Sequence, residues 1–279
     1  MLCRALRGPF VWGCLSVAVA MVIAPLTSTS ANGEEVVEIA TRPGQSVRAL
    51  IDKPAKSIGS VILLVGGHGN LNLTMDGKIG WGAGNQVVRT RAAYAAKGFV
   101  ALVPDIAPDL KNGEKVQPGY RWSAKHATDI GALVRHLRSI AAPVYLVGTS
   151  RAALSVANAA TRLKGEERPD AIVITSGMIA SAKVKQPFAE TKVGRLERIT
   201  QPVLLVYHEK DGCAYTPASS GQRAKSLFKG AKRVDLKILS GGEDGGGDPC
   251  KAQTHHGFLG QDAEVVDLVT EWLKTSGAK

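Results

Sequence analysis

Residues 143–160 read Pro-Val-Tyr-Leu-Val-Gly-Thr-Ser-Arg-Ala-Ala-Leu-Ser-Val-Ala-Asn-Ala-Ala, and this stretch decides the fold. An apolar run leads into a turn around Ser150, and a run of small residues with helical character follows. Small residues beside the serine let the helix pack close to the strand, and the strained turn lifts the hydroxyl above the sheet. The pentapeptide at 148–152 therefore resembles the G-x-S-x-G pattern of a nucleophile elbow, with Ala152 in place of the last glycine.

The first 31 residues have the composition of a secretory signal peptide. Arg4 and Arg7 give a basic start, and residues 10–24 form an apolar run. Pro25 breaks this run, and residues 29–31 are small, as a cleavage site requires. The apolar run is shorter than the ~20 residues of a membrane-spanning helix. We expect cleavage after residue 31 and export of residues 32–279 to the periplasm or the medium; an uncleaved membrane anchor is the alternative.

The charge and the cysteines limit the classes of protein. The net charge is +11, but the basic residues are scattered and form no recognised nucleic-acid-binding motif, so we expect no nucleic-acid partner. A basic exported protein favours anionic surfaces or substrates. No second apolar stretch has spanning length, so no membrane insertion is expected after cleavage. Beyond the signal the cysteines are Cys213 and Cys250, which predicts a disulfide in an exported chain.

Buried-strand patterns alternate with helical ones along the rest of the chain. Predicted strands cover residues 36–39, 47–51, 60–65, 98–103, 144–147, 171–174, 203–207 and 234–239, and predicted helices cover 86–97, 130–137, 152–160, 217–228 and 265–272. Such alternation predicts an α/β fold with a mostly parallel sheet covered on both faces. The first two strands should pair antiparallel, and the last should lie near an edge. We expect one domain over 32–279, with residues 177–200 as a small cap.

An acid and a histidine follow the serine in chain order. Asp211 comes after the predicted strand 203–207, and His256 lies in a loop before the last helix. A serine hydroxyl needs a base to take its proton, and the histidine needs a carboxylate to fix its tautomer. Glu209 is the alternative acid, and His255 is the alternative base.

A glycine-rich loop at residues 66–70 follows the first long buried strand and can supply an oxyanion site. Glycines allow the backbone to approach the elbow closely. One amide between Gly67 and Asn70, with Gly67 and His68 as the named candidates, is the expected first donor. The amide of Arg151 is the expected second donor, aided by the helix dipole.

These motifs resemble the α/β-hydrolases across residues 35–275, and the order Ser, Asp, His is that family's own. The resemblance implies an α/β-hydrolase fold of esterase-like or dienelactone-hydrolase-like type, with a mostly parallel twisted sheet and a minimal cap. It implies the roles of nucleophile for Ser150, charge-stabilising acid for Asp211 and general base for His256. A bridge between Cys213 and Cys250 would tie the acid loop to the histidine loop.

The leading hypothesis is an exported serine hydrolase that cleaves a small-molecule ester or amide through an acyl-enzyme. It requires neither a metal nor an organic cofactor. A peptidase or an acyltransferase would use the same residues. A binding protein that retains the fold without turnover is the alternative from another class.

Overall fold

The computed structural model describes residues 33–180 and 185–276. The predicted signal peptide, with Cys3 and Cys14, therefore lies outside the described residues. None of the helices within the described ranges combines the length and the apolar character needed to cross a membrane.

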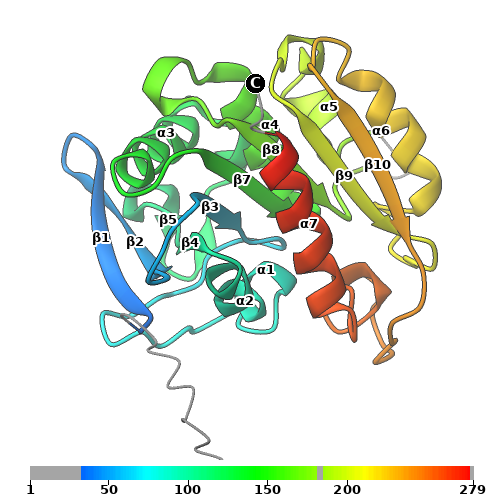
Figure 1. Ribbon diagram of the computed structural model, residues 1–279, viewed down its shortest axis with the longest axis horizontal. Helices are drawn as coiled ribbons and strands as arrows, with labels where there is room; N and C mark the ends of the chain where they lie inside the picture. Colours follow the sequence, from blue (N-terminus) through cyan, green and yellow to red (C-terminus); the bar gives the residue numbers. More distant parts are fainter. Residues whose placement is uncertain (1–32, 181–184, 277–279) are drawn as a thin grey trace, which may run out of the picture.

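Within the described residues, eight strands form one sheet in the order β1-β2-β4-β3-β7-β8-β9-β10 (Figure 1). The strands are β1 (Glu35–Arg42), β2 (Gln45–Asp52), β3 (Gly59–Leu64), β4 (Phe99–Pro104), β7 (Val144–Thr149), β8 (Ala171–Thr175), β9 (Val203–His208) and β10 (Val234–Leu239). β2 pairs antiparallel with β1 and with β4, and every other pairing is parallel. Two short strands, β5 (Lys111–Asn112) and β6 (Lys115–Val116), form a separate hairpin. The predicted leading hairpin and mostly parallel sheet are confirmed.

The burial of the strands explains why their sequences read as continuous apolar runs. Every residue of β3, β4, β7, β8 and β9 is buried, as expected of strands covered on both faces. β10 has no buried residue and lies at the end of the strand order, which confirms the predicted edge position.

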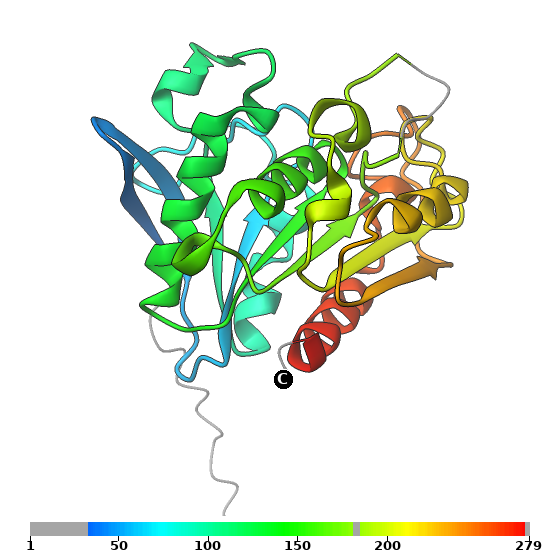
Figure 2. The ribbon, with the colours of Figure 1, turned by 90° about the horizontal axis from the view of Figure 1, so that it is seen from above.

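Helices cover both faces of the sheet: α1 (Gln86–Arg89), α2 (Arg91–Ala96), α3 (Ala124–Arg138), α4 (Ala153–Arg162), α5 (Ala189–Lys192), α6 (Gly221–Leu227) and α7 (Asp262–Ser276). α1, α2 and α7 lie on one face, whereas α3, α4 and α6 lie on the other (Figure 2). Successive side chains of β3 alternate between the two resulting cores: Ile62 and Leu64 pack with α3 and α4, and Val61 and Leu63 pack with α1 and α7.

The predicted helix over residues 86–97 is divided into α1 and α2 at Thr90. Thr90 has φ −96° and ψ 0°, and its hydroxyl donates to the Gln86 carbonyl at 2.7 Å. A threonine hydroxyl that bonds back to the preceding turn competes with the regular helical pattern. In the predicted cap, the described residues contribute α5 and a 3₁₀ turn at Leu196–Arg198, so this cap is small.

Candidate active site

Ser150 lies on the sharp turn between β7 and α4. Its φ is +55°, a left-handed conformation in a non-glycine residue, and a 3₁₀ turn at Ser150–Ala152 leads into the helix. Such a backbone conformation costs about 1–3 kcal/mol and persists only where the surrounding structure enforces it. The predicted strand, turn and helix are therefore present, with the serine at the strained position.

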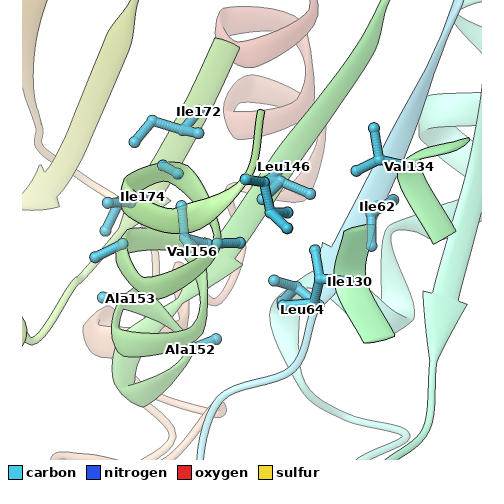
Figure 3. Close-up of a cluster of buried hydrophobic side chains, with 14 of the residues drawn as sticks. Ile62, Leu64, Ile130, Val134, Leu146, Ala152, Ala153, Val156, Ile172 and Ile174 are labelled. Carbon is cyan, nitrogen blue, oxygen red and sulfur yellow. The ribbon is translucent and has the colours of Figure 1, made fainter. Parts of the chain in front are cut away.

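Close packing beneath the turn explains the small residues on either side of the serine. A Cβ at Gly148 would lie 2.5 Å from Cγ2 of Val156, so no larger residue fits there without movement. Ala152 is fully buried in the core cluster that also contains Ala153 and Val156 (Figure 3). The methyl group that replaces the usual last glycine is thus accommodated as a core side chain.

The structure brings Asp211 and His256 together. Nδ1 of His256 lies 3.0 Å from Oδ2 of Asp211, and both side chains are buried. The Thr216 hydroxyl donates to the same carboxylate oxygen at 2.9 Å, and the Cys213 amide donates to the other oxygen at 2.9 Å. With Nδ1 donating its proton to the carboxylate, Nε2 of the neutral imidazole is left as an acceptor.

Ser150 and His256 line the same small cavity. Its volume is about 30 Å³, and its wall also includes Gly67 and Cys250. Nε2 of His256 is buried and has no hydrogen-bond partner among the residues that the structure describes. A histidine with an unpartnered ring nitrogen, in the wall of a cavity shared with a serine, is the arrangement in which a substrate or water completes the hydrogen bonding.

The alternative acid and base have other positions. Glu209 is exposed. The ring of His255 stacks on that of His208, with centroids 4.5 Å apart and an interplanar angle of 8°. Asp105, which follows β4, accepts hydrogen bonds from the loop amides of residues 71 and 73 and from Lys111. The geometry thus brings Asp211 to His256.

The glycine-rich loop packs directly against the serine. A Cβ at Gly66 would lie 3.2 Å from Cβ of Ser150, and Gly67 has φ +54°, so both positions favour glycine. The Asn70 amide donates to Nδ1 of His68 at 3.1 Å, so this N–H is already used in a hydrogen bond within the loop. Burial, followed by the charges of Arg121 and Arg151, lowers the pKa of His68.

Sequence reasoning missed Arg121, which holds the far side of this loop. Its side chain is buried, and Nη2 donates to the carbonyls of residues 65, 66 and 67 at 2.8, 3.3 and 3.2 Å. In a trans peptide the N–H of the next residue points opposite to the carbonyl. Arg121 therefore directs the amides of Gly66, Gly67 and His68 away from itself. No sequence pattern distinguishes this arginine from a surface one.

Arg121 has oxygen acceptors but no carboxylate partner among the described residues. Its Nη1 donates to the Ser155 hydroxyl at 2.9 Å, and Ser155 lies 3.0 Å from Nε2 of His126. Burial and then the Arg121 charge lower the pKa of His126 to about 3, so His126 is neutral at pH 7 and shares a hydrogen bond with the Ser155 hydroxyl. This network fixes one cation beneath the loop.

A disulfide joins Cys213 and Cys250, as predicted. Cys213 lies two residues after Asp211, and Cys250 lines the cavity that contains Ser150 and His256. The bridge therefore connects the acid loop to the histidine loop.

Replacing both cysteines with alanine is expected to lower the free energy of unfolding by about 4 kcal/mol, because the closed loop of the unfolded chain is released. Catalytic turnover should fall as well, since the acid and histidine loops lose their covalent link. Urea unfolding and ester-hydrolysis assays of the variant and of reduced wild-type protein provide the measurement. Unchanged stability together with unchanged turnover would refute the role given to the bridge.

Among the described residues, Asp211, Cys213 and His256 form a group with ligand atoms within 4.8 Å of one another. The sulfur of Cys213 is bonded to Cys250 and cannot serve as a thiolate ligand. The remaining carboxylate and imidazole already satisfy each other. This donor set fits a hydrogen-bonded acid–base pair better than a metal centre.

No protein-family model matches the sequence, and no curated protein matches it. Solved structures do match. Est1E from Butyrivibrio proteoclasticus, determined with ferulic acid, is 16% identical with a TM-score of 0.59, over 87% of this chain and 100% of that one. The Pyrococcus furiosus esterase Pf2001 is 15% identical with a TM-score of 0.61, over 97% of both chains. A dienelactone hydrolase from Anabaena variabilis is 14% identical with a TM-score of 0.60, over 88% of this chain and 98% of that one.

The strand order, the elbow at Ser150 and these likenesses define the class: the chain has the α/β-hydrolase fold. Its sheet carries the leading antiparallel hairpin followed by parallel strands, with helices on both faces.

Proposed function

We propose that the protein is a serine hydrolase that cleaves an ester, or a small amide, through an acyl-enzyme. The observation that carries the proposal is the buried Asp211–His256 pair: His256 has an unpartnered Nε2 and lines one cavity with Ser150, which lies on a strained turn. Nucleophile, base and orienting acid are the three groups that activate a serine hydroxyl. Among the structural neighbours, Pf2001 is an esterase and the Anabaena variabilis protein is a dienelactone hydrolase, which supports this chemistry.

In the first half of the reaction, Oγ of Ser150 attacks the carbonyl carbon while Nε2 of His256 takes the hydroxyl proton. Asp211 holds the imidazole in the required tautomer and stabilises the imidazolium. The oxyanion accepts hydrogen bonds from the Arg151 amide and from the amide of Gly67 or His68. The imidazolium then protonates the departing alcohol, which leaves an acyl-serine.

In the second half, water enters the position that the alcohol has left. His256 takes a proton from this water, and the resulting hydroxide attacks the acyl carbonyl. Collapse of the second tetrahedral intermediate releases the carboxylic acid and returns the proton to Ser150. All steps use side chains and amides of this chain.

We further propose that residues 32–279 form one exported domain acting on small molecules, with no nucleic-acid partner and no membrane insertion after signal cleavage. The disulfide supports the export, because such bonds persist in oxidising compartments.

The test is labelling of residues 32–279 with a fluorophosphonate, alongside hydrolysis of p-nitrophenyl butyrate. The wild type and a Ser240→Ala control, which alters an exposed serine, should be labelled and active, whereas Ser150→Ala should be neither. Labelling that persists in Ser150→Ala would remove this serine from the mechanism. Absence of turnover in all three proteins would favour the binding-protein alternative.

A further inference from the structure

An apolar groove adjoins the cavity that contains Ser150. Its volume is about 240 Å³, and Gly67 lines both the groove and the cavity. Its walls include Val116, Pro118, Trp122 and Pro187. We call it the Trp122 groove. An apolar chain or an aromatic ring attached to an ester carbonyl at Ser150 would pack against these apolar walls.

The arginines that line the Trp122 groove give its wall a positive charge. Its lining contains Arg121 and Arg151 but neither aspartate nor glutamate. Arg121 is buried, and its Nη1 and Nη2 already donate to Ser155 and to the loop carbonyls, so it adds positive charge here while its two terminal nitrogens are engaged within the protein. The ammonium of Lys192 lies 6.0 Å from the ring centroid of Trp122 and adds a further cation at this edge.

Arg151 differs from Arg121 because its guanidinium is open to a ligand. It is half-buried, lines the groove and makes no side-chain hydrogen bond or ion pair within the described ranges. It is also the residue directly after Ser150, so it lies beside the reacting centre. A guanidinium binds a carboxylate through two parallel hydrogen bonds, more specifically than a lysine does.

We propose that the Trp122 groove binds a substrate portion that combines an apolar or aromatic body with a carboxylate, and that the Arg151 side chain pairs with this carboxylate. The inference rests on the proposed hydrolase function and specifies its substrates as anionic esters. The apolar walls contact the apolar part of the substrate, and the Arg151 guanidinium favours substrates that carry the carboxylate.

The experiment compares matched ester pairs that differ in one charge. p-Nitrophenyl hydrogen glutarate and p-nitrophenyl pentanoate test the acyl side, and 4-carboxyphenyl butyrate and phenyl butyrate test the alcohol side. The readout is the ratio of kcat/KM for the anionic ester to that for its neutral partner. Because the same two esters are used for every variant, intrinsic differences in ester reactivity cancel.

In at least one pair, Arg151→Gln should lower this ratio by about 10-fold to 100-fold, the equivalent of one charged hydrogen-bond contact. Arg151→Lys should retain part of the preference. Arg198→Gln is the matched control, since it removes an exposed arginine outside the groove and should leave the ratio unchanged.

Ratios that stay within about twofold of wild type in Arg151→Gln for both pairs would overturn the proposal, because a paired charge contributes more than this. Failure of the hydrolase function looks different: the neutral esters would show no hydrolysis that depends on Ser150. The two outcomes are therefore separable in one set of assays.

Discussion

Replacing His256 with alanine is expected to lower kcat for p-nitrophenyl butyrate by about 10⁴-fold to 10⁶-fold, because the serine loses the base that takes its proton. His256 is positioned for this role by its 3.0 Å hydrogen bond to Asp211, its Nε2 has no partner among the described residues, and the residue lines the cavity shared with Ser150. The fold should persist, since the 3₁₀ turn at His255–Gly257 is capped by Thr254 through the His256 backbone amide. Steady-state kinetics and circular dichroism measure the two effects.

His255→Ala is the matched control for this variant, since it removes the neighbouring histidine. The His255 ring packs on His208, and its loss should affect stability more than kcat. If His255→Ala lost activity while His256→Ala kept it, the assignment of the base would be reversed. Asp211→Asn should also lower kcat, as His256→Ala does, because the imidazole would lose its orienting carboxylate.

Replacing Arg121 with methionine is expected to lower kcat by about 10²-fold to 10³-fold, the cost of losing an ordered oxyanion donor. The guanidinium holds three successive carbonyls of the loop, so its removal would free the peptide planes that carry the proposed oxyanion donors. KM should change much less, because the apolar walls of the Trp122 groove remain. Kinetics per active site titrated with fluorophosphonate give the measurement.

Arg121 acts as a positioning residue, and its test must separate positioning from stability. Methionine at this position leaves the loop carbonyls without their donor, so stability is expected to fall together with kcat. Arg121→Lys should recover part of kcat, since an ammonium can still bond one or two of the carbonyls. A variant with lowered thermal stability but wild-type kcat per titrated site would assign Arg121 a structural role alone.

The sequence predicted the sheet well because its central strands have a direct signature. Strands buried on both faces appear as uninterrupted apolar runs, and each predicted run became a strand of the parallel sheet. The predicted helix over 86–97 was less accurate. The break at Thr90 depends on one hydroxyl bonding the preceding turn, which hydrophobic periodicity does not report.

The sequence also placed the candidate catalytic residues at strand ends, because the carboxyl ends of parallel strands meet at one edge. It left Glu209 beside Asp211 and His255 beside His256 as alternatives. Residues one or two positions apart follow the same strand, so only side-chain direction separates them. In the structure, Asp211 and His256 face each other, whereas His255 turns toward His208.

The sequence by itself determined the order of strands and helices, the strained serine turn and the pairing of two cysteines, because each depends on local patterns or on a small number of choices. Tertiary structure alone decided the role of Ala152 and the contacts of Arg121. Ala152 replaces the expected glycine because the core beneath the elbow has room for a methyl group. Arg121 reaches a loop more than fifty residues earlier in the chain, and only the folded sheet brings the two together.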